Sequence, residues 1–445
     1  MHGDARGEIM VAYDEAFQLI TQHIRVLDFE EKPLLQCVGQ VLAEDIRAGI
    51  NLPQNDIAGP DGYAVRSADI QGAGKNRPVT LQVIGTVRAG HLPVRVIRPG
   101  TAMRIMTGSV LPKGADCVVK FEDTDEPKNK SGPNRDQPRE VKIYASALPG
   151  GSVRSAGSGY KKGDWLLPKG TVIGPAQVSV LAATGKRRIK VVRKPVVAIV
   201  ATGDELVGLG RPLIPGRTYN ANTVTLAALV RHFGGKPISL GIARDRKDDL
   251  LAKIEKGKKT DLIITTGGVA MGDYDLTRLV VGGIGKVHFS LVRMGPGAGA
   301  VFAELGKDSR TTGRVKVPMF GLAGPPSACL VNFETLVRPA LLKMRGLSEV
   351  GHPVVEAVAA DSMKSAIPAI FAKWTYLEKR NGQYQVKLNV LEEKGVWPAL
   401  ATTNSLTLVP EGANICAGDK VSVWPLDWRR DQFPPAYINV EDAEH

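Results

Sequence analysis

Residues 196–206 read VVAIVATGDEL, and residues 261–275 read DLIITTGGVAMGDYD. In each segment a continuous apolar run stops at a polar turn that contains glycine, which is typical of a buried parallel strand followed by a loop. Apolar residues recur at helical spacing in 222–233 and 248–255, and a further apolar run at 238–243 lies between these two segments. The alternation of strands and helices predicts a doubly wound α/β domain, with helices on both faces of a parallel sheet.

The sequence on either side of this domain predicts a different set of helices and short strands. Apolar residues at helical spacing predict helices over 10–32 and near 34–42, and a long helix over 326–344. Short apolar runs between glycines and prolines predict one small β domain after Pro53 and a second after Gly346. The strands expected in the first of these β domains are 79–84, 94–97, 102–106 and 117–121.

Composition limits the classes of protein to consider. The 445 residues are 43% hydrophobic and 23% charged, which is ordinary globular composition. The net charge of +13 suggests an anionic partner, but the densest basic runs, 186–188 and 256–259, are short and lack aromatics, so nucleic acid is disfavoured. The sequence contains no long apolar span, no signal peptide and no closely spaced cysteine pair. We therefore expect a cytoplasmic protein with no membrane partner.

In a doubly wound sheet, ligands bind beyond the carboxyl ends of the strands. Three loops are expected there, at 201–206, 265–275 and 321–327. The Thr-Thr-Gly-Gly sequence in the second loop favours an anion site, because glycines let backbone amides converge and hydroxyls add donors. The same residues would also suit a tight turn in which the glycines serve backbone geometry alone.

Three carboxylates allow both a functional and a structural interpretation. Asp275 could hold Mg²⁺ against phosphate oxygens, since carboxylates are hard ligands. Glu205 could contact a bound ring or a metal-bound water, or it could interact with a helix macrodipole. Asp61, in a Pro-Asp-Gly sequence, could be functional or could simply form a turn. No histidine pairs with a serine or cysteine in a nucleophile arrangement, so covalent catalysis has no support.

Five segments together resemble the MoeA family of molybdopterin molybdenumtransferases, which includes the E domain of gephyrin. The likeness covers about residues 10–425. The matching segments are LPQNDIAGPDGYAVR at 52–66, RIMTGSVLPKGADCVV at 104–119, ATGDEL at 201–206, TTGGVAMGDYDLTR at 265–278 and FGLAGPPSACLVNFETLVRPALLKMRG at 320–346.

The resemblance implies an α/β multidomain protein with a MogA-like doubly wound domain, two small β-rich domains and an elongated helical/β linker domain. It also implies a homodimer in which the cleft combines the α/β domain of one subunit with other subdomains of its partner. The expected boundaries are 1–48 with 148–180 for the linker domain, 49–147 for the first β domain, 181–346 for the molybdopterin-binding domain and 347–445 for the C-terminal β-barrel-like domain.

The function implied by the resemblance is the Mg²⁺-assisted insertion of molybdate into adenylylated molybdopterin, with release of AMP. A molybdopterin adenylyltransferase is an expected partner. Asp61, Thr107, Glu205 and Asp275 match functional positions of the family: Asp61, Glu205 and Asp275 are the catalytic candidates, with Glu205 and Asp275 as metal ligands. The candidate molybdopterin-binding residues are Thr107, Thr202, Gly203, Thr266, Gly267, Gly268, Val269, Gly272, Gly324 and Ser327.

Other family positions are replaced. The Asp-Asn-Ser-Ala-Met-Asp run reads Asp-Ile-Ala-Gly-Pro-Asp at 56–61, and two family aspartates fall on Gly159 and Asn220. The Lys-Pro-Gly-Lys-Pro signature reads Gly-Pro-Gly-Ala-Gly at 295–299, so both lysines are missing. Gly-Asn-Pro reads Gly-Pro-Pro from Gly324, and a serine patch is replaced around Pro398–Ala401.

These losses concentrate on ligand positions, which indicates a divergent member of the family. Removing two lysines should weaken anion binding by roughly a kcal/mol or more each. The alternative function is therefore a molybdopterin-binding or scaffold protein that has lost metal insertion.

Overall fold

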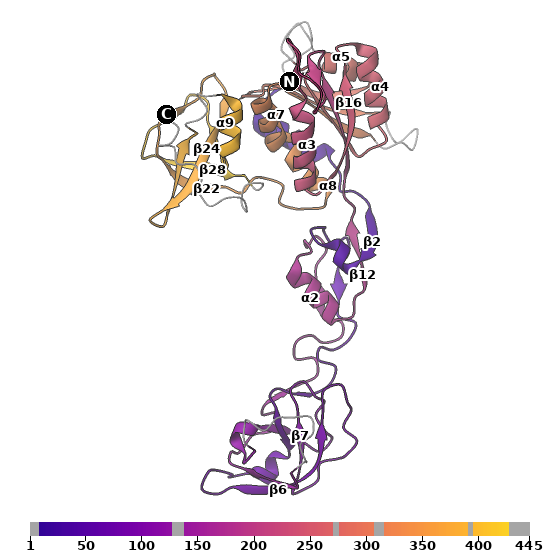
Figure 1. Cartoon of the computed structure of the whole chain (residues 1–445), viewed down its shortest axis with the longest axis vertical. Coiled ribbons are helices and arrows are strands. Elements are labelled where there is room, and N and C mark those ends of the chain that lie inside the picture. The colour runs from indigo at the N-terminus through magenta and orange to yellow at the C-terminus, as the bar shows by residue number, and fades with distance from the viewer. Residues whose placement is uncertain (1–8, 127–137, 270–275, 307–315, 390–394, 427–445) are drawn as a thin grey trace. The chain divides into compact units, whose positions relative to one another are not determined.

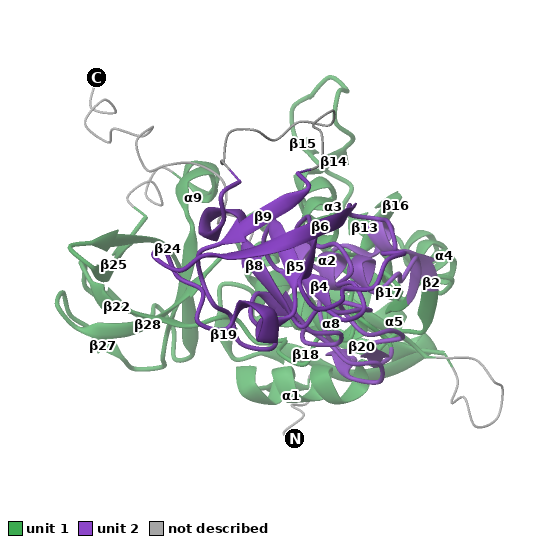
Figure 2. Cartoon of the chain, turned by 90° about the horizontal axis from the view of Figure 1, so that it is seen from below, with its two compact units in different colours: residues 1–30, 39–43, 190–445 green, residues 31–38, 44–189 purple. Residues whose placement is uncertain are grey.

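The computed structural model describes residues 9–126, 138–269, 276–306, 316–389 and 395–426. It divides into two compact units, coloured separately in Figure 2. Unit 1 comprises residues 1–30, 39–43 and 190–445, and unit 2 comprises residues 31–38 and 44–189. The four-domain boundaries expected from the sequence are finer than this division and remain a prediction.

Unit 1 is built on a seven-stranded sheet with the order β1-β18-β20-β21-β17-β13-β16. The strands are β1 (Met10–Val11), β13 (Val196–Thr202), β16 (Lys236–Ala243), β17 (Leu262–Thr266), β18 (Gly285–Val292), β20 (Gly299–Leu305) and β21 (Val317–Leu322). β13 runs parallel to β16 and β17, and β17 runs parallel to β21, as predicted. β20 is antiparallel to both of its neighbours, so the sheet is mixed.

Helices cover both faces of this sheet because successive strand residues point to opposite sides. Val197 and Ile199 of β13 join the core formed with α1 (Tyr13–His23) and α3 (Ala221–His232). The alternate residues Ala198 and Val200 join the core formed with α4 (Lys247–Gly257) and α5 (Leu276–Ile284). All four helices are labelled in Figure 2, and α3, α4 and α5 also in Figure 1. The doubly wound prediction is confirmed.

The long helix expected at 326–344 is interrupted. It consists of α7 (Pro326–Asn332), a π-helical turn (Phe333–Val337) and α8 (Arg338–Met344). Pro339 at the start of α8 lacks an amide hydrogen, and its ring would clash with the carbonyl four residues earlier in a regular α-helix. A π turn directly before a proline relieves that clash.

Two expectations for the N-terminal segment are wrong. The helix predicted over 10–32 is limited to α1, and 29–33 forms the strand β2 (Phe29–Pro33). The helix predicted near 34–42 is only a 3₁₀ turn, Leu34–Cys37. The backbone leaves helical geometry at Ile24 and again at Val38, whose ψ angles are 133° and 130°, and Pro33 disfavours helical backbone only at the residue before it.

Unit 2 contains a five-stranded sheet with the order β8-β5-β7-β6-β9. The strands are β5 (Gly62–Val65), β6 (Val79–Val87), β7 (Thr101–Ile105), β8 (Cys117–Lys120) and β9 (Glu140–Ile143). The strand expected at 94–97 does not form. Val94 and Val96 are 94% and 52% exposed, and of this apolar run Ile97 alone packs into a core. Unit 2 also holds the helix α2 (Pro175–Ala183).

Unit 1 also contains a six-stranded sheet with the order β19-β24-β25-β22-β28-β26, in which every strand except β19 follows α8. The strands are β19 (Met294–Gly295), β22 (Val355–Ala359), β24 (Ile370–Arg380), β25 (Gln383–Leu388), β26 (Ser405–Val409) and β28 (Lys420–Pro425), and the helix α9 (Val396–Thr402) precedes β26. The second β module predicted after Gly346 is confirmed. Across the described residues, no helix has the length and apolar character needed to cross a membrane.

Candidate functional site

A pocket of about 1230 Å³ lies in unit 1 where β13, β17 and β21 end. All three loops expected from the sequence line it, which confirms that the carboxyl edge of the parallel strands is hollowed. The lining segments are Thr202–Leu206, Thr218–Asn222, Thr266–Val269, Pro296–Gly299 and Ala323–Ala328, together with Asp245, Leu276, Leu279, Val396 and Trp397. The pocket is large enough for a nucleotide-sized ligand.

Gly267 and Gly268 form a tight turn against the end of β13. Their φ angles are +88° and +67°, which side chains rarely adopt. A Cβ on Gly267 would lie 2.5 Å from the carbonyl oxygen of Thr202, and one on Gly268 would lie 3.0 Å from the Thr202 hydroxyl. Glycine is therefore required at both positions by backbone geometry and by close packing.

The backbone amides of this turn divide into two groups. The Gly267 N–H donates to the Leu322 carbonyl oxygen at 3.1 Å and is used within the fold. For the N–H groups of Gly268 and Val269, the described residues supply no hydrogen-bond acceptor. The turn is thus at least partly structural.

The two threonines predicted to contact a ligand are engaged in bonds between loops. Thr266 is 2% exposed, and its hydroxyl donates to the Ala323 carbonyl oxygen at 3.2 Å while accepting from the Asn222 side chain at 2.9 Å. The Thr202 hydroxyl donates to the Thr266 carbonyl oxygen at 3.4 Å. These hydroxyls hold the second loop to the first and the third.

Two side-chain amides, which were not among the residues predicted from the sequence, complete this scaffold. The Asn222 side chain also donates to the Gly324 carbonyl oxygen at 2.8 Å. Asn332 is fully buried; it accepts from the Ala323 N–H at 3.1 Å and donates to the Gly297 carbonyl oxygen at 2.8 Å. A buried asparagine needs hydrogen-bond partners, so its presence in α7 was a usable signal.

Acidic side chains gather beside the first loop. Gly203 has φ of +150°, and the Glu205 carboxylate folds directly over its α-carbon. The Asp204 N–H donates to the Asp245 carboxylate at 3.2 Å, and Arg244 donates to the Asp204 carbonyl oxygen at 3.0 Å. Within the described residues, the pocket lining has three carboxylates and neither lysine nor arginine.

Two further predicted residues of unit 1, Gly324 and Ser327, lie in the third loop. The Ser327 hydroxyl accepts from the Trp374 indole N–H at 2.7 Å, which joins the pocket to the C-terminal sheet. Gly324 passes close to Gly267, where an added Cβ would lie 3.6 Å from the Gly267 α-carbon. Gly272 and Asp275 lie outside the described residues.

In unit 2 the structure brings together Asp61 and Thr107. The Asp61 carboxylate accepts from the Thr107 N–H at 2.6 Å and from its hydroxyl at 2.8 Å. Both residues are exposed. Asp61 precedes β5 and Thr107 follows β7, and these two strands pair, so the sheet fixes the separation of the two residues.

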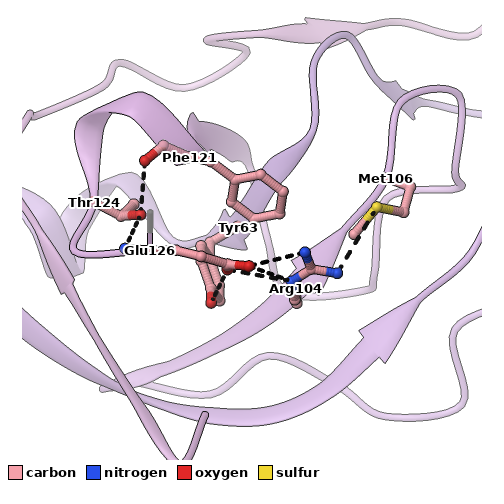
Figure 3. Close-up of polar contacts among 6 residues, drawn as sticks. All are labelled: Tyr63, Arg104, Met106, Phe121, Thr124 and Glu126. Carbon is pink, nitrogen blue, oxygen red and sulfur yellow. Dashed lines mark hydrogen bonds and ion pairs between the residues drawn. The ribbon is translucent and has the colours of Figure 1, made fainter. Parts of the chain in front are cut away.

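A polar network lies inside unit 2, where Tyr63 of β5 is opposite Arg104 of β7 (Figure 3). The Tyr63 hydroxyl donates to the Glu126 carboxylate at 2.6 Å, and Arg104 donates to the same carboxylate at 2.8 and 3.0 Å. The Arg104 guanidinium also lies 4.6 Å from the Phe121 ring centroid. Burial, together with the bond to Glu126, raises the pKa of Tyr63 well above its usual value. Tyr63 therefore stays protonated as a donor.

Known proteins match this chain over nearly its full length. A molybdopterin molybdenumtransferase of Nostoc sp. is 34% identical over 409 residues, which cover 91% of this chain and 90% of the relative. The chain belongs to the molybdopterin molybdenumtransferase family. A member from Bacillus subtilis is 32% identical over 407 residues, 90% of each chain. Residues 11–185 match the MoeA N-terminal region (domain I and II), and 198–343 match a probable molybdopterin binding domain.

A solved structure agrees with this family assignment. The molybdopterin biosynthesis MoeA protein from Pyrococcus horikoshii superposes with a TM-score of 0.79 at 32% identity, covering 94% of this chain and 99% of that chain. The candidate pocket lies within the segment that matches the molybdopterin binding domain, apart from Val396 and Trp397 of α9. The family assignment made from the five sequence segments is confirmed.

Proposed function

We propose that this protein inserts molybdate into adenylylated molybdopterin and releases AMP, in a step that requires Mg²⁺. The observation that carries the proposal is the pocket at the ends of β13, β17 and β21, where a tight glycine turn lies beside a carboxylate cluster. Its volume of about 1230 Å³ suits a pterin linked to a nucleotide.

Each part of the pocket has a task in this proposal. The N–H groups of Gly268 and Val269 bind a phosphate oxygen, and Gly203, Gly324 and Ser327 form the walls beside it. Thr202, Thr266 and Gly267 support this surface by holding the loops together, and Gly272 belongs to the same sequence motif.

The donor set fits a magnesium ion. Mg²⁺ is usually held by one or two carboxylates together with substrate phosphates and water. Glu205 lines the pocket, and Asp275 follows the glycine turn in sequence, so these two residues would be its protein ligands. When bound, the ion neutralises the negative charge that develops on the phosphates during cleavage.

We further propose that Asp61 and Thr107 act in a homodimer. Both are exposed at the edge of unit 2, and their side chains already share two hydrogen bonds, so they are pre-oriented as a pair. In the dimer they would face the pocket of the second subunit. A molybdopterin adenylyltransferase would deliver the adenylylated substrate.

A second candidate function is supported by the charge of the pocket. The turn at 295–299 carries no lysine, and the nearby Arg293 is already paired with Glu411 at 2.7 Å. A described lining with three carboxylates and no cation repels molybdate unless Mg²⁺ or a partner subunit supplies positive charge. A binding or scaffold protein that has lost metal insertion would show this pattern.

The deciding experiment measures AMP. Purified protein is mixed with adenylylated molybdopterin, Mg²⁺ and molybdate, and AMP is quantified over time. We expect release that depends on both added ions, falls at least tenfold in Glu205→Gln and is unchanged in the exposed control Glu349→Gln. Tight binding of the substrate without AMP release selects the scaffold function, and failure to bind it contradicts both.

A further inference from the structure

Three side chains outside the pocket converge in unit 1. His23 is the last residue of α1, His288 lies in β18 and Glu304 lies in β20. The carboxylate of Glu304 lies 3.2 Å from Nδ1 of His23 and 3.0 Å from Nε2 of His288, and both distances end on the same oxygen. The three potential ligand atoms all lie within 4.8 Å of one another. Elements distant in sequence thus supply one cluster.

A β-bulge aims His288 at this cluster. In the pairing of β18 with β20, Val287 lies opposite Ala303 and Phe289 lies opposite Phe302, so His288 is an extra residue. The bulge lets two consecutive side chains share a face, since the rings of His288 and Phe289 lie 5.2 and 5.7 Å from the ring of Phe302. Bulges often re-aim a side chain toward a functional position.

Both imidazoles approach the same carboxylate oxygen of Glu304. Their ring centroids are 3.9 Å apart, and His288 is only 7% exposed. Imidazole nitrogen is a common ligand of transition metals, so two rings this close to one carboxylate oxygen form a compact donor set.

We propose that His23, His288 and Glu304 bind a divalent transition-metal ion, with Zn²⁺ as the occupant. Bonds from zinc to imidazole nitrogen and carboxylate oxygen are about 2.0–2.2 Å, which places tetrahedral ligands roughly 3.3 Å apart. The observed separations of 3.2 and 3.0 Å from the carboxylate oxygen are near that edge length. Water fills the fourth position.

Lys316 lies 3.8 Å from the same oxygen of Glu304 and offers a competing arrangement, in which the carboxylate is satisfied by hydrogen bonds and an ion pair alone. The two arrangements differ in their consequences. A metal would join the end of α1 to β18 and β20 by coordinate bonds, so its addition would stabilise unit 1 by mass action.

The test uses tag-free, full-length protein with Mg²⁺ in excess, which blocks sites built from carboxylates alone. Co²⁺ is titrated while visible absorption is recorded, because tetrahedral Co²⁺ with nitrogen ligands absorbs strongly, and Zn²⁺ is then added as competitor. We expect one Co²⁺ per chain, displaced by Zn²⁺, and a rise in melting temperature with Zn²⁺.

Two variants make the site specific. His23→Asn and Glu304→Gln should each weaken Zn²⁺ affinity at least tenfold and remove the rise in melting temperature. His91→Asn is the matched control, since His91 is an exposed histidine of unit 2. Wild-type protein that binds no Co²⁺, or a His23→Asn protein that binds Zn²⁺ as tightly as wild type, would overturn the proposal.

Discussion

The pocket of unit 1 and the Asp61–Thr107 pair of unit 2 are supported in different ways. Around the pocket, the groups that join the loops are neutral: the hydroxyl of Thr266 and the amides of Asn222 and Asn332. Beside Asp61 and Thr107, the support is a buried ion pair, Arg104 with Glu126. Neutral anchors add no net charge, so the net charge of the described pocket lining comes from its carboxylates.

The largest effect is expected where backbone geometry alone supports the site. Gly267→Ala places a Cβ 2.5 Å from the Thr202 carbonyl oxygen at a φ of +88°, so we expect a loss of roughly 2–4 kcal/mol in the free energy of unfolding and no substrate binding. Denaturant unfolding and substrate titration measure the two. Gly282→Ala, in α5 with open space around it, is the control and should be neutral or slightly stabilising.

The second-largest effect on stability is expected at the ion pair of unit 2. Glu126→Gln leaves Arg104 without its partner, and because the Glu126 side chain is only 5% exposed we expect a loss of about 2–3 kcal/mol. Urea denaturation measures it. Glu31→Gln breaks the exposed pair with Arg188 and should change stability by about 0.5 kcal/mol or less. Equal losses in the two variants would remove the contrast between buried and exposed pairs.

The neutral anchors of the pocket predict a smaller change in stability and a larger one in binding. Asn222→Ala removes donors to Thr266 and to the Gly324 carbonyl oxygen, so we expect a loss of roughly 1–2 kcal/mol. Substrate affinity should fall at least tenfold because the second and third loops separate. Calorimetric titration of the substrate provides the measurement, and unchanged affinity would show that the loops hold together without this side chain.

The smallest effect concerns pH. Partial burial alone would raise the pKa of Asp116, but the hydroxyl and N–H of Ser67 donate to its carboxylate and lower the pKa below its usual value. The resulting stability is present above the usual pKa and is lost as pH falls through the folded value. Ser67→Ala should therefore cost up to about 1 kcal/mol at neutral pH and less in acid. A loss that does not change with pH would contradict this assignment.

The sequence predicted the part of the fold that hydrophobic pattern controls. The apolar runs of β13 and β17, each ending in a glycine turn, were sufficient for the doubly wound sheet and the place of its pocket. The antiparallel β18 and β20 were not predicted, because apolar strands of either direction look alike when both faces are buried.

Side-chain roles were harder to predict than positions. Thr266 was expected to bind a ligand, yet its hydroxyl is buried and bonded to Ala323 and Asn222. The partners of a hydroxyl depend on loops distant in sequence, which local patterns do not reveal. The closeness of Asp61 and Thr107 also depends on the pairing of β5 with β7, a long-range contact.

Asn332 has a consequence for how this family member can diverge. One carboxamide serves the turn at Gly297 and the turn at Ala323 simultaneously. A substitution or insertion that shifts either turn leaves a buried polar atom of Asn332 without its hydrogen-bond partner, so the two turns must change together. The turn at 295–299 reads Gly-Pro-Gly-Ala-Gly and has no charged side chain, and its backbone bond to Asn332 depends on main-chain position alone.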